Sequence, residues 1–105
     1  MAQFTIYANA NAQTKQLYPY LLELQSNLLS ELVTCVVAPL TLVSKHSHLA
    51  ISRLTPVINV AGEDYLMQTM QVSAIARKQL GKIVGDASAN SHEIIAAVDF
   101  LISGF

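Results

Sequence analysis

The sequence predicts a mostly antiparallel β fold, of the small-barrel or twisted-sheet type, that ends in one α-helix. Three observations support this prediction. Short strand-like segments follow one another with turn signals between them, strands and helices do not alternate along the chain, and a clear helical period occurs only near the carboxyl end. The length of 105 residues suits one domain, 1–105, because a second core would have too little sequence to build it.

The first strands flank a polar loop. Gln3–Tyr7 alternates polar and apolar residues and is predicted to be a strand. Ala8–Gln16 is rich in small polar residues that bury little apolar surface, so we expect a mobile hairpin loop. Tyr18–Gln25 returns as the second strand, and Pro19 suits the first residues of a strand or an exposed edge.

The middle of the chain combines a turn, a buried strand and an irregular segment. Ser26–Glu31 is predicted to be a turn that carries Leu28 and Leu29 outward. Val33–Pro39 is β-branched and nearly continuously apolar, which is typical of a strand buried on both faces. Leu40–Leu54 has no regular period and is predicted to be a loop with at most a short strand.

A hairpin signal follows. Pro56–Ala61 and Tyr65–Thr69 have strand composition and flank the predicted turn Gly62–Asp64, where glycine supplies the backbone freedom that a tight turn needs. Val72–Ile83 fits a strand and a helix equally well.

The last element is a predicted helix of about three turns. Asn90 can cap its start, with Glu93 three positions later completing a capping box, and Gly104 stands where a helix can stop. A helix this short is marginal alone, so we expect it to dock. One helical stripe carries its apolar residues: Ile94, Ile95, Val98, Leu101 and Ile102.

The composition predicts an oligomer. Hydrophobic residues make up 52% of the chain and charged residues only 12%, against a usual charged share of about 25%. A monomer of this composition would expose large apolar patches, and such patches usually mark interfaces. The simplest assembly is a two-fold dimer.

The carboxyl end, Asp99–Phe105, is nearly all apolar and carries no charged tail, so we expect other protein to cover it. The alternative is that Ile102 and Phe105 fold back into their own core. Asp99 faces the negative end of the helix dipole, at a cost of about 0.3–1 kcal/mol. Either a partner offsets that cost, or a nearby Lys or Arg pairs with Asp99.

Several locations and partners are disfavoured. The longest apolar run, Val33–Val43, is too short to cross a bilayer, and the amino terminus lacks a signal-peptide pattern, so we expect a cytoplasmic protein without a membrane partner. A single cysteine, Cys35, permits no internal disulfide. The net charge of −1 provides no broad attraction for nucleic acid.

No residue set predicts a metal, a cofactor or a catalytic group. His46 and His48 together with Cys35 could bind zinc, but the usual spacing of four ligands is absent, so surface histidines are the better interpretation. Within an apolar strand, Cys35 is better explained as a small core residue than as a nucleophile.

Two charged groups are interpreted as solvated surface. Adjacent carboxylates at Glu63 and Asp64 are usual in a hairpin turn and are a weak signal for hydrolysis. Arg77, Lys78 and Lys82 could contact a phosphate backbone, but no aromatic residues stand among them, so a solvated face is expected.

Five segments carry a family likeness that extends over nearly the whole chain. Together they resemble the CcdB toxins of plasmid and chromosomal toxin–antitoxin modules, and the hairpin and the carboxyl-terminal helix are the most specific parts. The segments are QFTIYAN (Gln3–Asn9), LQSNLL (Leu24–Leu29), VVAPL (Val36–Leu40), RLTPVINVAGEDYLM (Arg53–Met67) and EIIAAVDFLISGF (Glu93–Phe105).

The resemblance implies a homodimer of SH3-like β domains, each with a terminal helix. It also implies a toxin that is not an enzyme, serves plasmid maintenance, binds the DNA gyrase A subunit and traps the cleaved-DNA intermediate. A CcdA-like antitoxin with a disordered carboxyl-terminal segment would neutralise it, lying along apolar surface next to the Ala8–Gln16 loop. Operator DNA would be contacted only through the toxin–antitoxin complex.

Carried over position by position, the resemblance assigns residues to two interfaces. Val98 and Leu101 would lie at the dimer interface, near the two-fold axis. The gyrase-facing residues would be Leu28, Leu29, Asp99, Ile102, Ser103, Gly104 and Phe105.

The chain departs from the family pattern at three places. Relatives carry an indole two residues from the end and an aliphatic last residue, where this chain has Ser103 and Phe105. Cys35 stands where relatives carry an arginine within the buried strand, and Ser73–Ile75 replaces a Ser-Val-Pro run.

Two other functions are compatible with such a chain. One is a ribonuclease toxin of the MazF or Kid type, which would need a basic RNA groove and an acid–base pair, and the low count of Lys and Arg disfavours it. The other is a non-toxic homologue that binds the antitoxin only as a co-repressor.

Overall fold

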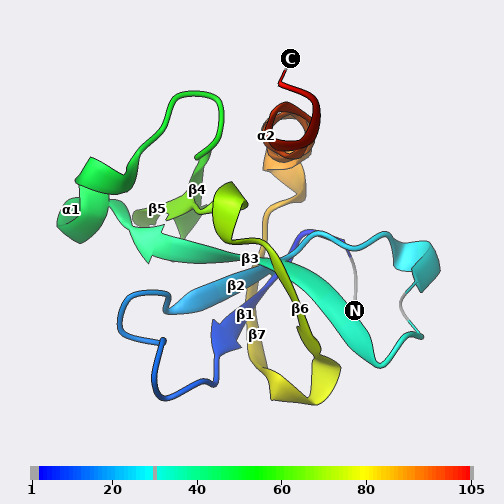
Figure 1. The fold of residues 1–105 in the computed structure, drawn as a ribbon. Coiled ribbons are helices and arrows are strands. Elements are labelled where there is room, and N and C mark those ends of the chain that lie inside the picture. The colour runs from blue at the N-terminus through cyan, green and yellow to red at the C-terminus, as the bar shows by residue number, and fades with distance from the viewer. Residues whose placement is uncertain (1–2, 30, 105) are drawn as a thin grey trace.

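The chain folds into a strongly curled antiparallel sheet followed by a carboxyl-terminal helix (Figure 1). The structure, a computed structural model, describes residues 3–29 and 31–104. The predicted fold class is therefore confirmed. None of the helices within those residues is long and apolar enough to span a membrane.

Seven strands form the sheet, in the order β4-β5-β3-β2-β1-β7, and β6 pairs with β3 beside this path. The strands are β1 (Thr5–Asn9), β2 (Tyr20–Glu23), β3 (Thr34–Leu42), β4 (Val57–Val60), β5 (Glu63–Met67), β6 (Ser73–Ala76) and β7 (Leu80–Asp86). The helices are α1 (Val43–His46) and α2 (Ser91–Ser103), with 3-10 turns η1 (Asn27–Leu29), η2 (Ser47–Leu49), η3 (Thr69–Gln71), η4 (Arg77–Gln79) and η5 (Ser88–Asn90).

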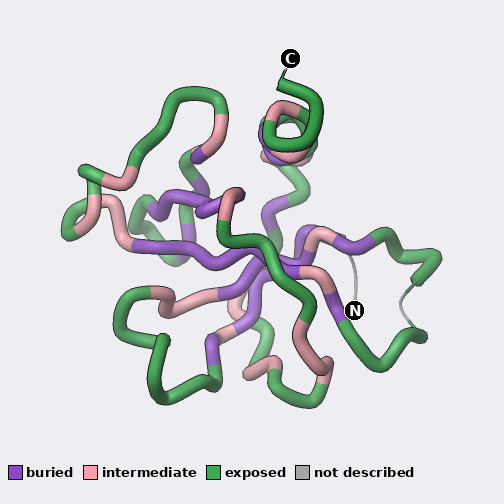
Figure 2. The backbone as a smooth tube through the Cα atoms, in the orientation of Figure 1, coloured by how far each residue is buried: buried purple, intermediate pink, exposed green. Residues whose placement is uncertain are grey.

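Strand β3 is buried on both faces, as its apolar sequence predicted (Figure 2). On one face Ala38 and Leu40 join the main core, beneath Ile94 and Ala97 of α2. On the other face a smaller cluster forms. It consists of Leu21, Cys35 and Val37, with Ile75 and Leu80 packed against it.

The segments without a clear period hold more regular structure than predicted. Strand β3 runs to Leu42 and is followed by α1 and η2, where the sequence predicted mainly loop over Leu40–Leu54. A four-residue helix is too short to produce a period, so its sequence carries no signal. The ambiguous segment Val72–Ile83 divides into β6, η4 and the first part of β7, because pairing with β3 and β1 stabilises the extended form.

The predicted hairpin is confirmed, but its turn lies one residue earlier. Ala61 and Gly62 are the two turn residues, with φ of 53° and 89°, and positive φ at both positions matches the twist of a tight hairpin. Glu63 and Asp64 are therefore exposed residues of β5 and not turn residues. Asn59 stabilises the turn, because its amide donates to Asp64 Oδ1 over 3.0 Å.

Helix α2 ends as predicted but begins differently. Gly104 has φ of 77° and donates its N–H to the Phe100 carbonyl, which closes the helix. The predicted capping box is wrong, because Asn90 makes no side-chain cap hydrogen bond. Asn90 belongs to the preceding turn η5, and its φ of −103° and ψ of 13° are not the extended values of a capping residue.

Two neighbouring isoleucines in α2 provide a matched test of the docking. We expect Ile94→Ala to lower the free energy of unfolding by about 2–5 kcal/mol, because Ile94 is fully buried and its truncation leaves a cavity. The same change at Ile95, which is 48% exposed, should cost about 1 kcal/mol or less. Urea denaturation of both variants measures the difference, and equal losses would contradict the observed orientation of the helix.

Candidate partner-binding surfaces

The end of α2 presents an exposed apolar side chain. Ile102 is 79% exposed, and Asp99, Ser103 and Gly104 are exposed around it. Ile95 lies seven residues earlier and so on the same side of the helix. Figure 1 shows this end of α2 clear of the strands. Ile102 does not fold back into the core, and the prediction for Phe105 concerns a residue outside those that the structure describes.

Asp99 has no ion-pair partner within residues 3–29 and 31–104. The arginine that lines the same groove, Arg53, places its guanidinium 4.2 Å from the centroid of the Phe100 ring and pairs with that ring instead. The groove measures about 570 Å³ and lies between residues 50–57 and α2. The electrostatic cost of Asp99 at this helix end is therefore not offset by an ion pair within the described part of the chain.

The leucine loop, residues 26–29 and 31–33, is a second exposed apolar surface. Leu28 is 94% exposed and Leu29 is 47% exposed, which confirms that both point outward. Leu32 and Val33 are exposed beside them, at 50% and 82%. The sequence analysis gave Leu32 no role, and its placement of Val33 in the buried strand is wrong, because β3 begins at Thr34. Figure 1 shows η1 and the end of α2 well apart, so within one protomer they form two separate surfaces.

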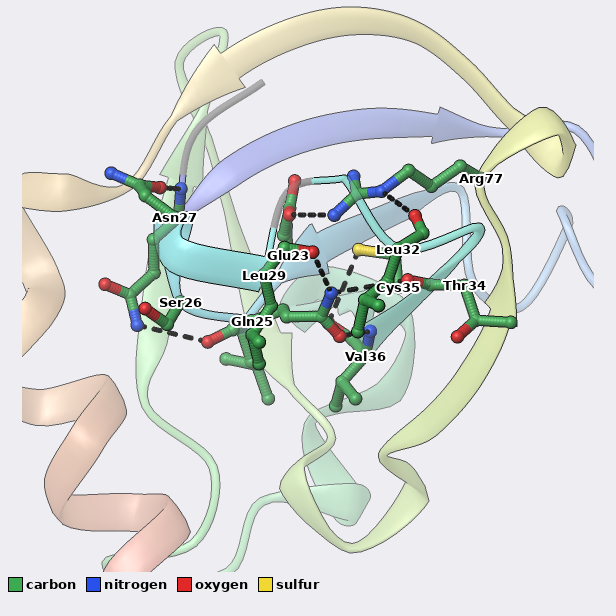
Figure 3. A network of polar contacts seen from close by, with 12 residues as sticks. Glu23, Gln25, Ser26, Asn27, Leu29, Leu32, Thr34, Cys35, Val36 and Arg77 are labelled. Carbon is green, nitrogen blue, oxygen red and sulfur yellow. Dashed lines mark hydrogen bonds and ion pairs between the residues drawn. The ribbon is translucent and has the colours of Figure 1, made fainter.

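A buried ion pair lies beneath the leucine loop (Figure 3). Arg77 Nη2 is 3.2 Å from Glu23 Oε2, and the Glu23 side chain is almost completely buried. The predicted solvated face is therefore wrong for Arg77, whereas Lys78 and Lys82 are exposed. The Tyr7 hydroxyl donates to Glu23 Oε1 over 2.9 Å, and burial together with this carboxylate raises the pKa of Tyr7.

Cys35 lies in the smaller core cluster next to this ion pair. The residue is fully buried, which confirms the prediction of a core cysteine. Burial first, and the negative charge of Glu23 second, raise the pKa of the Cys35 thiol to about 11. A thiol in this state is a poor nucleophile because the thiolate is the reactive form.

The two histidines do not join Cys35. The rings of His46 and His48 contact each other edge to face, with centroids 5.9 Å apart. Among the described residues no group of three or more His, Cys, Asp or Glu side chains could hold a metal ion. His48 is exposed and His46 is half-buried.

A cleft of about 390 Å³ lies beside the loop between β1 and β2. Asn9 shapes this loop, because its amide donates to Thr14 Oγ1 and to the Tyr18 carbonyl, over 3.0 and 2.8 Å. The residues that line the cleft are all uncharged. They are Asn9, Ala10, Asn11, Thr14, Tyr18, Leu21, Val37, Pro39, Gln71, Ser73, Ile75 and Gln79.

The two residues predicted to lie at a dimer interface remain partly accessible in the single chain. Val98 is half-buried and Leu101 is 38% exposed. Their role in a dimer stays a prediction.

The comparisons with known proteins agree with the curled sheet and the terminal helix. A sequence model of the family described as CcdB protein matches residues 3–104. The chain belongs to the CcdB family. Its members are toxins of toxin–antitoxin systems, and this CcdB protein is assigned that general role. A search of curated proteins gave no match.

Solved structures with the same fold include two proteins from mycobacterial species. One is an endoribonuclease in complex with its cognate antitoxin, and the other is an endoribonuclease. Each is 13% identical to this chain, with a TM-score of 0.75. Both matches cover 97% of this chain; they cover 94% of the chain of the first protein and 90% of the chain of the second. At this identity the likeness concerns the fold.

Sequence reasoning missed two residues that donate hydrogen bonds to the backbone of the leucine loop, Arg77 and Gln25. Arg77 stood in a basic cluster that predicts a surface, and Gln25 is an uncharged polar residue at the end of a strand. The only available signal was Glu23, a carboxylate within an apolar strand, which needs a buried partner. That signal does not say which of the six Lys and Arg residues supplies the partner.

The state of Cys35 gives a direct chemical prediction. In folded protein at pH 8, a disulfide reagent such as DTNB should label less than about a tenth of the thiol within an hour, because the thiol is buried and protonated. In denaturant the same reagent should label one thiol per chain. Rapid labelling of the folded protein, in the range where its circular dichroism is unchanged, would contradict the buried position.

Proposed function

We propose that this CcdB protein is a cytoplasmic, homodimeric toxin that binds the DNA gyrase A subunit and stabilises the cleaved-DNA complex. The observation that carries the proposal is the exposure of Ile102 at a helix end that no other part of the described chain covers. Family membership supports the same role. Two such helix ends beside a two-fold axis would form one symmetric apolar surface with acidic edges.

The proposed action is binding without chemistry. A protein that binds the cleaved state of an enzyme more tightly than the resealed state shifts the population towards cleavage. The apolar surface provides contact area, and the carboxylate of Asp99 gains a favourable contact if the bound surface carries a cation. Preference for one gyrase state would follow from contacts that exist only in that state.

The proposal predicts a large effect at one residue. We expect Ile102→Ser to raise the toxin concentration needed for half-maximal cleavage by about tenfold or more, because an exposed apolar anchor is lost at the centre of the interface. Gel analysis of DNA cleaved by purified gyrase measures this. Ile83→Ser is the matched control, because Ile83 is 59% exposed on β7, outside the predicted surface, and should leave cleavage unchanged.

A cellular experiment separates the target from general toxicity. Expression should stop the growth of cells with normal gyrase and spare cells whose gyrase A subunit resists this class of toxin. Equal killing of both strains would exclude gyrase as the target. Normal growth of both would support the non-toxic homologue that serves only as a co-repressor.

We also propose that the uncharged cleft beside the β1–β2 loop receives a segment of a CcdA-like antitoxin. The lining combines the apolar side chains of Leu21, Val37, Pro39 and Ile75 with amide and hydroxyl side chains. Such a surface suits an extended segment that folds on binding, because apolar side chains can be buried while backbone groups find partners. Operator DNA would be contacted through the antitoxin.

A substitution in the cleft tests whether the antitoxin binds there. We expect Ser73→Arg to weaken binding of an antitoxin carboxyl-terminal peptide by about tenfold, because a long charged side chain would enter an uncharged cleft. Gyrase cleavage by this variant should stay at the wild-type level. Calorimetric titration with the peptide measures the affinity, and an unchanged value would place the antitoxin elsewhere.

RNA cleavage is the alternative activity, since two proteins of the same fold are described as endoribonucleases. The uncharged lining of the cleft offers neither a general acid–base pair nor cations for a phosphate backbone. Incubation of purified protein with RNA tests this directly. RNA cleavage by the purified wild-type protein, together with toxicity that persists in cells with resistant gyrase, would replace the gyrase proposal.

A further inference from the structure

The leucine loop exposes four large apolar side chains together: Leu28, Leu29, Leu32 and Val33. Flexible apolar segments usually collapse onto neighbouring surface, because burial of each such side chain is favourable by about 1.5–3 kcal/mol. The structure shows the loop extended from the sheet instead, with its backbone held at several points (Figure 3). The groups that hold it come from η4 and from the residue that directly precedes the loop.

Arg77 holds the carboxyl-terminal side of the loop. Its backbone N–H donates to the Val33 carbonyl and its Nε donates to the Leu32 carbonyl, each over 2.9 Å. The ion pair with Glu23 fixes the other side of the same guanidinium. Because Nε and Nη2 belong to one planar group, pairing with Glu23 orients the donor to Leu32.

Gln25 holds the loop from the strand end below it. Its side-chain amide donates to the Leu29 and Thr34 carbonyls, over 3.0 and 3.3 Å, and its Oε1 accepts from the Val36 N–H over 3.2 Å. Gln25 is buried, so these bonds form away from competing water. Together Arg77 and Gln25 bind four backbone carbonyls, those of Leu29, Leu32, Val33 and Thr34.

A buried ion pair contributes little to the free energy of unfolding compared with apolar residues of similar size. The cost of removing two charges from water often equals the gain from pairing them, and apolar replacements can be neutral. The specific effect of the Glu23–Arg77 pair is geometric, since it directs a donor to the backbone of the leucine loop. Because the loop is already held in one conformation, ordering it on binding costs less conformational entropy.

We propose that Arg77 and Gln25 are positioning residues, and that they hold the leucine loop as a preformed contact for the gyrase A subunit in which Leu32 and Val33 bind beside Leu28 and Leu29. This inference rests on the proposed function. The gyrase subunit is favoured because Leu32 and Val33 continue the surface of Leu28 and Leu29, which the family resemblance assigns to gyrase. None of these four residues lines the cleft proposed for the antitoxin.

The contact is tested with Val33→Ser and Leu32→Ser. Each variant should weaken binding to purified gyrase A subunit by about five- to twentyfold, because an apolar contact is lost. Affinity for the antitoxin peptide should stay within about twofold of the wild-type value, because the cleft is untouched. Ile83→Ser again serves as the exposed apolar control.

The positioning role is tested with the double variant Glu23→Gln/Arg77→Met, which leaves no unpaired buried charge. We expect gyrase affinity to fall by about tenfold, with faster amide hydrogen exchange at Leu32, whose N–H donates to the Leu29 carbonyl. Arg77→Lys keeps the charge but loses the Nε donor. Its gyrase affinity should therefore lie between that of the wild type and that of the double variant. Lys78→Met, the exposed neighbour, is the control.

The outcomes distinguish the two proposals. If wild-type protein binds gyrase and all loop and anchor variants bind equally well, the inference is overturned while the gyrase proposal stands. If the double variant loses gyrase and antitoxin affinity in equal measure, Arg77 is only a scaffold residue and the inference is also overturned. If wild-type protein does not bind gyrase, both proposals fall.

Discussion

The double burial of β3 is the constraint on which the rest of the structure depends. Its two ends pair with different strands on one side, β6 at the amino-terminal end and β5 at the carboxyl-terminal end, while β2 pairs on the other. Side chains alternate between the main core below α2 and the smaller cluster around Cys35. A register slip by one residue would exchange the two sets of side chains, so the strand fixes both faces at once.

The two proposed functional surfaces differ in what supports them. The end of α2 is held by the docking of Ile94 and Ala97, so apolar burial at one side of the helix leaves Ile102 exposed at the other. The leucine loop has few buried apolar residues of its own and depends on hydrogen bonds from Arg77 and Gln25. One surface therefore depends on packing and the other on a polar network, and changes in the core affect them differently.

Sequence reasoning succeeded where a local pattern was sufficient. The hairpin around Gly62, the helix stop at Gly104 and the outward leucines each follow from residues close together in the chain, and the structure confirms them. It failed at α1, which is too short for a period, and at Asn90, where the preceding turn changes the backbone geometry. The role of Arg77 requires contact with Glu23, 54 residues away, which no local pattern contains.

The cation beside Glu23 comes from a distant part of the chain. The guanidinium belongs to Arg77 in η4, after β6 and 54 residues beyond Glu23. A chimaera that grafts this loop onto a relative would receive the leucines without their support, unless position 77 is transferred with it.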